Sequence, residues 1–226
     1  LSFNILARFA VPVFFVIAGY LFFQRTLHKP LTSYTQAYLV KIFMMYLVWT
    51  FIYHLVFGLS VGVWNPITLA STLYYGTAGF EILWFLPALF YSILLLAIAQ
   101  QFNKTGALFI VATLLHVIGL VNQSYQPLLP ESFQFIDTNF RDPAFFGLFF
   151  VCLGYQLLKQ QWVEKLLTVS KNPLTWLMVC VVTAVVMIIE GLTLIQQFKG
   201  PIGEYYLFTP LLTIAMLMVA LTIKGR

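Results

Sequence analysis

A cationic side chain and a proline lie one helical turn apart at the start of an apolar segment, RFAVPVFFVIAGYLFF, which covers residues 8–23. On a helix, Arg8, Pro12 and Gly19 fall on one face. Pro12 has no N–H, so the carbonyl of Arg8 loses its usual partner within the helix. Ala18 and Gly19 are small enough to let a neighbouring backbone approach closely. This face has two interpretations. It belongs either to a kinked helix whose arginine reaches the lipid headgroups, or to the cationic wall of a polar cavity.

Glutamate and tryptophan supply the next candidates for binding chemistry. Glu81 and Trp84 share one face at the start of a later apolar run. These two residues either line a polar cavity, or they are a glutamate favoured by the helix dipole at the helix start and a tryptophan that anchors the helix at the membrane interface. Glu190 lies late in another apolar run, where a carboxylate is costly unless it is paired. Arg8 or Arg141 is a plausible partner for it.

Polar residues precede two prolines along the chain. Asp142-Pro143 and Asn172-Pro173 each place a capping side chain before a proline at the first helical position, which predicts two helix starts. Arg141, directly before the first of these caps, reads either as a binding residue or as a flanking charge.

Several familiar chemistries have no motif in this chain. The sequence contains no Gly-rich phosphate loop, no HExxH, no GxSxG and no paired metal carboxylates, so we expect no metal. His54 and His116 lie singly in apolar runs and are interpreted as packing residues rather than bases. Cys152 and Cys180 also lie in apolar runs and read as small core residues rather than as a disulfide.

Composition defines the class of protein. Of the 226 residues, 61% are hydrophobic and only 8% are charged, whereas soluble domains have roughly 25% charged residues. Such a chain cannot cover a water-facing surface, so it is an integral membrane protein. The formal charge of +5 is attributed to cytoplasmic loops and anionic lipid, not to a nucleic-acid partner.

Seven continuous apolar runs are long enough, or nearly so, to cross a bilayer as helices. They predict an all-α, polytopic transmembrane bundle that forms a single membrane domain over residues 1–226. The runs do not alternate as the strands of a membrane barrel do. The lysine-rich segment 159–172 predicts either a short helix in the membrane interface or a simple connector. The seven runs are 4–23, 41–61, 82–100, 106–121, 143–158, 173–195 and 205–223.

The basic residues predict an orientation. With the N-terminus outside, three of the 12 Lys and Arg residues, Arg8, Arg141 and Lys199, face outward. The other nine face the cytoplasm, as the positive-inside rule favours. These nine are Arg25, Lys29, Lys41, Lys104, Lys159, Lys165, Lys171, Lys224 and Arg226.

Four segments in order resemble helices of the membrane acyltransferase family 3. The first is the opening segment 8–22, and the second is LWFLPALFYSILL at 83–95. The third is RDPAFFGLFFVCLGYQL at 141–157, and the fourth is GEYYLFTPLLTIAML at 203–217. The four segments follow the family's order and are spread over nearly the whole chain.

The resemblance implies an activity and a location. Members of this family are multi-pass proteins of the bacterial cytoplasmic membrane, and some occur in eukaryotes. They move acyl groups, usually acetyl, from acyl-CoA to hydroxyls of envelope carbohydrates and related molecules. The resemblance therefore implies acyl-CoA as the donor, with membrane lipid and a hydroxyl acceptor as the other partners. It further implies that Arg8 and Arg141 bind anionic or carbonyl groups, that Lys41 meets the CoA phosphates, and that Glu81 and Trp84 shape the acceptor side.

The sequence departs from the family pattern at several points. The family's first helix, with the arginine and histidine thought to be catalytic, has no counterpart here, so the catalytic residue is expected upstream of Leu1. This chain alone is then expected to be inactive, and one or two later helices are also expected beyond Arg226. The Ser-Gly-aromatic motif is Ala18-Gly19-Tyr20, and the basic R-x-x-R motif keeps only Lys41.

Two further functions stay open at this stage. A transport or sensing module, like the membrane part of vancomycin-resistance serine racemases, has the same resemblance without acyl transfer. A seven-helix receptor fits the raw count of spans. It is disfavoured because the third span has no D-R-Y at its inner end and the seventh span has no lysine to hold a retinal.

Overall fold

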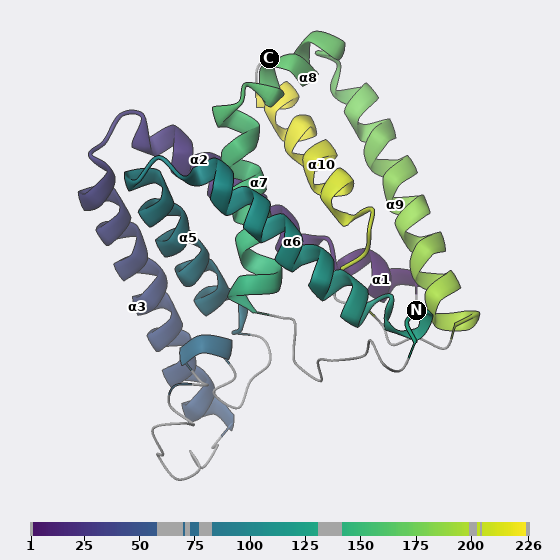
Figure 1. Cartoon of the computed structure of the whole chain (residues 1–226), viewed down its shortest axis with the longest axis horizontal. Helices are drawn as coiled ribbons and strands as arrows, with labels where there is room; N and C mark the ends of the chain where they lie inside the picture. Colours follow the sequence, from purple (N-terminus) through teal and green to yellow (C-terminus); the bar gives the residue numbers. More distant parts are fainter. Residues whose placement is uncertain are drawn as a thin grey trace.

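The computed structural model describes residues 2–57, 70, 73–76, 83–130, 142–198, 203 and 205–224, and all the regular structure in these ranges is helical. Figure 1 shows the helices as an open bundle in which successive long helices run in alternating directions. The elements are α1 (Ser2–Ala7), α2 (Ala10–Thr26), α3 (Leu31–Phe57), α5 (Phe85–Gln101), α6 (Thr105–Gln123), η1 (Gln126–Leu128), η3 (Pro143–Gly147), α7 (Leu148–Lys159), α8 (Trp162–Val169), α9 (Pro173–Gln196) and α10 (Thr209–Lys224).

Each of the seven predicted runs contains a helix. Within the described ranges, four helical segments are long and apolar enough to cross a membrane, and three shorter apolar helices accompany them. The largest error concerns α3, which starts at Leu31 rather than at residue 41. Its first ten residues, LTSYTQAYLV, carry hydroxyl and amide side chains that lower the hydropathy without breaking the helix. Segment 159–172 contains the short helix α8, and its position at a membrane interface stays a prediction.

The first predicted span is broken near its start. Arg8 and Phe9 form a turn between α1 and α2. Pro12, four residues after Arg8, cannot donate to the Arg8 carbonyl, and its ring crowds that carbonyl, so the helix bends at this point. The two predicted caps are confirmed. Asp142 accepts from the N–H of Phe145 at 2.8 Å, and Asn172 accepts from the N–H of Leu174 at 3.1 Å.

The closest contact in the bundle is a reciprocal glycine crossing between α2 and α7. A Cβ atom added at Gly19 would overlap the carbonyl oxygen of Val151, and one added at Gly154 would overlap the carbonyl oxygen of Val16. Each glycine therefore lies against the backbone of the opposite helix. Helices in lipid associate through such small-residue contacts, because apolar side chains gain little by leaving the lipid.

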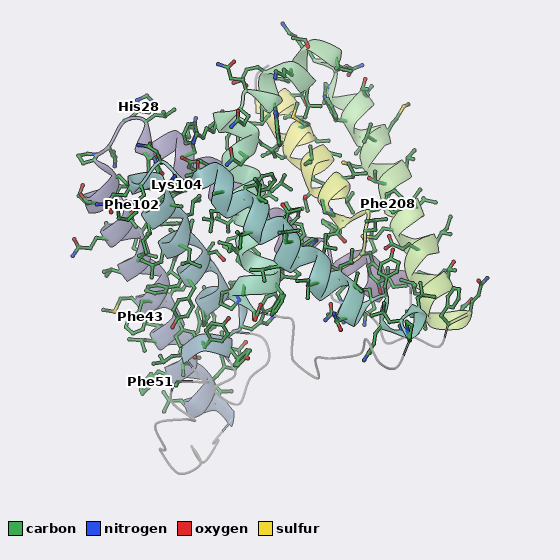
Figure 2. The ribbon with its side chains drawn as sticks, in the orientation of Figure 1. His28, Phe43, Phe51, Phe102, Lys104 and Phe208 are labelled. Carbon is green, nitrogen blue, oxygen red and sulfur yellow. The ribbon has the colours of Figure 1, made fainter. Side chains whose placement is uncertain are left out.

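The turns of the bundle divide into two ends. The α2–α3 turn, the α5–α6 turn, α8 and the end of α10 lie at the upper side of Figure 1. Figure 2 shows His28 and Lys104 at these first two turns. Of the nine Lys and Arg residues predicted to face the cytoplasm, those in the described ranges lie on the elements that meet at this end. The side of the membrane that this end faces stays a prediction.

We expect alanine at either crossing glycine to destabilise the bundle. Overpacking a tight contact costs about 1–3 kcal/mol, and here the obstructing atoms are backbone, so they cannot turn aside. Gly19→Ala and Gly154→Ala should each lower the thermal unfolding midpoint in detergent by several degrees. Gly106→Ala is the matched control, because a Cβ there meets nothing within 4 Å. Equal midpoints for all three variants would contradict a backbone-to-backbone crossing.

Candidate functional site

A basic hollow lies where the end of α2 meets the start of α3. It has a volume of about 440 Å³ and is lined by Arg25, Lys29, Tyr34, Ala37, Tyr38 and Lys41. The turn at 27–30 joins the two helices, and Lys29 lies in this turn. The other cations of the hollow, Arg25 and Lys41, lie on α2 and α3 themselves, so two helices and their turn bring three positive charges together.

Two tyrosine rings form a rigid wall of this hollow. Tyr34 and Tyr38 are one turn apart on α3, and their rings stack with centroids 5.9 Å apart and planes 6° from parallel. Phe22 of α2 packs against Tyr34 at 5.7 Å, and the Lys29 ammonium lies 6.0 Å from the same ring. None of the carboxylates in the described ranges lines the hollow. Its field is therefore positive, which suits a phosphate-bearing ligand.

A second hollow, on the α5 side of α3, is apolar. It has a volume of about 520 Å³, and Leu39, Phe43, Phe90 and Leu94 are among its lining residues. Phe43 is 40% exposed, and Figure 2 shows it with Phe51 along the outer edge of α3. An apolar hollow on a membrane-spanning helix suits lipid chains, so it offers no chemistry for a charged substrate.

An aromatic cluster occupies the opposite end of the bundle. Trp84 meets Phe146 edge to face at 5.1 Å, and Phe15 of α2 meets Phe146 at 5.9 Å. Tyr205 contacts the same phenylalanine at 5.1 Å. The glycine crossing places α2 beside α7, which brings Phe15 and Phe146 together.

His116 lies inside this cluster, between two rings. It packs between Phe149 at 4.1 Å and Tyr205 at 4.6 Å, with both ring pairs close to parallel. Ser124, directly after the end of α6, donates from its hydroxyl to the carbonyl of Tyr205 at 2.5 Å. One helix thus positions the histidine and also fixes the loop residue that covers it.

Asp142 starts the π-helical turn η3 beside the cluster. Its carboxylate is 4% exposed and also accepts a long hydrogen bond, 3.4 Å, from the hydroxyl of Tyr74. Burial raises the pKa of Asp142, although the hydrogen bonds from Phe145 and Tyr74 act in the opposite direction.

Glu190 joins α9 to the start of α10. Its carboxylate accepts hydrogen bonds from the Tyr125 hydroxyl, from the N–H of Leu207 at 2.6 Å and from the N–H of Phe208 at 3.3 Å. These donors come from Tyr125 and from the segment just before α10. The expected pairing of Glu190 with Arg8 or Arg141 stays a prediction, and Arg141 lies outside the described residues. Glu190 therefore holds in place the segment just before α10. Figure 2 labels Phe208 of this segment, beside α9.

The predicted site residues fall into several groups. Lys41 lines the basic hollow, and Trp84 is buried in the aromatic cluster. Arg8 is half-buried at the α1–α2 break, Tyr20 is half-buried on α2, and Gly19 forms the helix crossing. Glu81 and Arg141 lie outside the described residues.

Comparison with known proteins now identifies the family. A family model described as an acyltransferase domain matches residues 1–225. The chain belongs to the acyltransferase 3 family. No curated protein and no solved structure matched it. The resemblance seen in the four motif segments is therefore confirmed, and this acyltransferase 3 protein is an integral membrane protein.

The sequence alone did not predict every residue of the basic hollow and of the aromatic cluster in this acyltransferase 3 protein. Arg25 and Lys29 were assigned only to the basic side, although their spacing from Lys41 across a predicted turn was a usable signal. His116 was assigned to packing, and its ring contacts agree with that. Its companion Tyr205 is 89 positions away in the chain, so no local pattern could have joined the two.

We expect the Asp142 carboxylate to make stability depend on pH. Because its pKa is raised by burial, the unfolded chain loses this proton first as pH rises, and unfolding becomes easier. The loss of stability begins near the ordinary carboxyl pKa and ends above the raised value. Asp142→Asn keeps an acceptor for the Phe145 N–H and cannot ionise. Thermal unfolding across this range should therefore show a smaller pH slope for this variant than for the wild type.

The control for this measurement is Asp142→Ala, which removes the cap altogether. It should lower stability at every pH, by about 0.5–2 kcal/mol as other lost caps do. Identical pH slopes for the wild type and Asp142→Asn would contradict a raised pKa at this position.

Proposed function

We propose that this protein is an acyl-CoA-dependent O-acyltransferase of the bacterial cytoplasmic membrane. Its donor is acyl-CoA, with acetyl-CoA as the simplest case. Its acceptor is a hydroxyl of an envelope carbohydrate or a related molecule. In the reaction, the acceptor oxygen forms a bond to the thioester carbonyl carbon, the carbon–sulfur bond breaks, and CoA leaves as a thiol with the acceptor's proton.

The basic hollow is the observation that carries this proposal. CoA has a diphosphate and a ribose phosphate, and its adenine is flat. Arg25, Lys29 and Lys41 match the phosphates in charge. The stacked rings of Tyr34 and Tyr38 offer an aromatic wall for a flat base.

The opposite end suits the acceptor. Its aromatic rings match the apolar faces of a sugar, while Asp142 and Tyr205 bring polar groups to the same place. The family resemblance assigns Trp84 and Glu81 to the acceptor side, and Arg8 and Arg141 to anionic or carbonyl groups. Glu81 and Arg141 lie outside the described residues.

The direct test is transfer of radiolabelled acetyl from acetyl-CoA to a panel of envelope glycans, in membranes that express the protein. Labelled glycan is the expected result. Normal insertion with no transfer to any member of a broad panel would overturn the proposal.

Loss of one cation from the hollow should weaken the donor site. Lys41→Gln and Arg25→Gln should each raise the KM for acetyl-CoA by about tenfold, which corresponds to roughly 1.4 kcal/mol of lost binding. The effect should shrink as salt is added, because salt screens exposed charges. Lys104→Gln is the matched control, since Lys104 is exposed at the same end but does not line the hollow. Three equal KM values would place the CoA phosphates elsewhere.

A further inference from the structure

Two stacked rings in the aromatic cluster carry polar atoms that the described part of the chain leaves without a hydrogen-bond partner. They are Nδ1 of His116 and the hydroxyl of Tyr205. His116 is 4% exposed and Tyr205 is 0% exposed, so bulk water does not reach them. A buried polar atom without a partner is costly and rare in folded proteins. Two such atoms on adjacent rings therefore need an explanation.

The state of the His116 ring follows from its backbone contact. The imidazole makes a hydrogen bond with the backbone of Phe145, and Nδ1 is the nitrogen without a partner. Nε2 therefore carries the hydrogen and donates it to the Phe145 carbonyl, which leaves a lone pair on Nδ1. Phe145 lies in the π-helical turn Pro143–Gly147. Such turns occur frequently at functional sites.

The two rings are held in fixed positions. Phe149 stacks on the far side of His116 at 4.1 Å, and Phe150 meets its edge at 5.1 Å. The Ser124 hydroxyl fixes the backbone of Tyr205. These contacts hold the planes of both rings, and with them the lone pair of Nδ1 and the position of the Tyr205 oxygen. This is the preorganisation that binding sites require.

The missing partner must give a hydrogen to Nδ1. A carbonyl or carboxylate has none to give. A hydroxyl donates one hydrogen bond and accepts others, so it can satisfy Nδ1 and take a hydrogen bond from Tyr205 as well.

We propose that His116 and Tyr205 form a hydroxyl-binding site, in which an O–H group donates to Nδ1 of His116 and accepts from the Tyr205 hydroxyl. The O–H group belongs either to a water molecule or to the acyl acceptor. The acceptor role rests on the proposed function, and in that role the pair positions the acceptor hydroxyl for transfer.

Nitrogen NMR of the protein in lipid nanodiscs tests the site without any turnover. The chain has 3 histidines, and His116→Gln identifies the signals of His116 by their loss. We expect the Nε2–H form at neutral pH, with the Nδ1 resonance displaced toward the position of a hydrogen-bonded nitrogen. Tyr205→Phe keeps the ring stack and should reduce this displacement. A hydrogen on Nδ1, or an Nδ1 resonance at the unbonded position, would overturn the proposal.

Tyr206→Phe is the matched control for Tyr205→Phe. Tyr206 is the next residue and is equally buried, but it packs with Ile5, Met187 and Leu212 rather than with His116. It should leave the His116 signals unchanged. If both variants move these signals alike, the effect comes from the packing of the segment, and the hydroxyl of Tyr205 has no part in the site.

A sugar probe separates the two sources of the O–H group. Methyl α-D-glucopyranoside, titrated into the same sample, should shift the Nδ1 resonance saturably when the site takes an acceptor hydroxyl. A displaced resonance that ignores the sugar identifies water as the occupant, which supports the site and overturns its acceptor role.

Kinetics of the complete protein then tests positioning. Tyr205→Phe should raise the KM for the acceptor about tenfold and leave the KM for acetyl-CoA unchanged, whereas Tyr206→Phe should change neither. An unchanged acceptor KM in Tyr205→Phe overturns the positioning role. If no acyl transfer occurs at all, the proposed function fails, while the NMR result still decides whether the hydroxyl site exists.

Discussion

The contact between Gly19 of α2 and Gly154 of α7 sets the geometry of the bundle. In lipid, apolar side chains gain little by leaving one apolar surface for another, so close packing of backbones has to hold the helices together. Each glycine lies against a backbone carbonyl of the opposite helix. Because α2 and α7 also carry Phe15 and Phe149, their separation determines whether the aromatic cluster can close. The basic hollow depends on the same helix, since α2 supplies Arg25 at its other end.

The two polar regions differ in physical character. The hollow at Lys41 is open and positive, and its cations are exposed, so its attraction for a ligand acts at a distance and weakens with salt. The cluster around His116 is closed, and its polar atoms are fixed by stacked rings. As the proposed acceptor site, it would select a ligand by hydrogen-bond direction rather than by net charge. The proposed reaction, with a charged donor and a neutral hydroxyl acceptor, would use one site of each kind.

Hydropathy and cap residues predict most of the fold. Continuous apolar runs locate the seven helices, and Asp142 and Asn172 locate two helix starts, because these signals are local. The start of α3 was wrong because hydroxyl-rich turns at a membrane helix end resemble a loop in hydropathy. The candidate site is less predictable. Lys41 and Trp84 were found by motif, whereas the pairing of His116 with Tyr205 and of Glu190 with Tyr125 depends on contacts between distant segments, which no local pattern contains.

The glycine crossing also acts as a seal. Pro12 and Arg25 are separated by roughly 20 Å along α2, from the helical rise of about 1.5 Å per residue, and Gly19 lies near the middle of that distance. At this depth the backbones of α2 and α7 touch, so no water, ion or acyl chain fits between them. Under the proposed function, an acyl group would have to pass along another face of α2 to travel from the basic hollow to the aromatic cluster. The two helices leave no gap between them at the depth of the crossing.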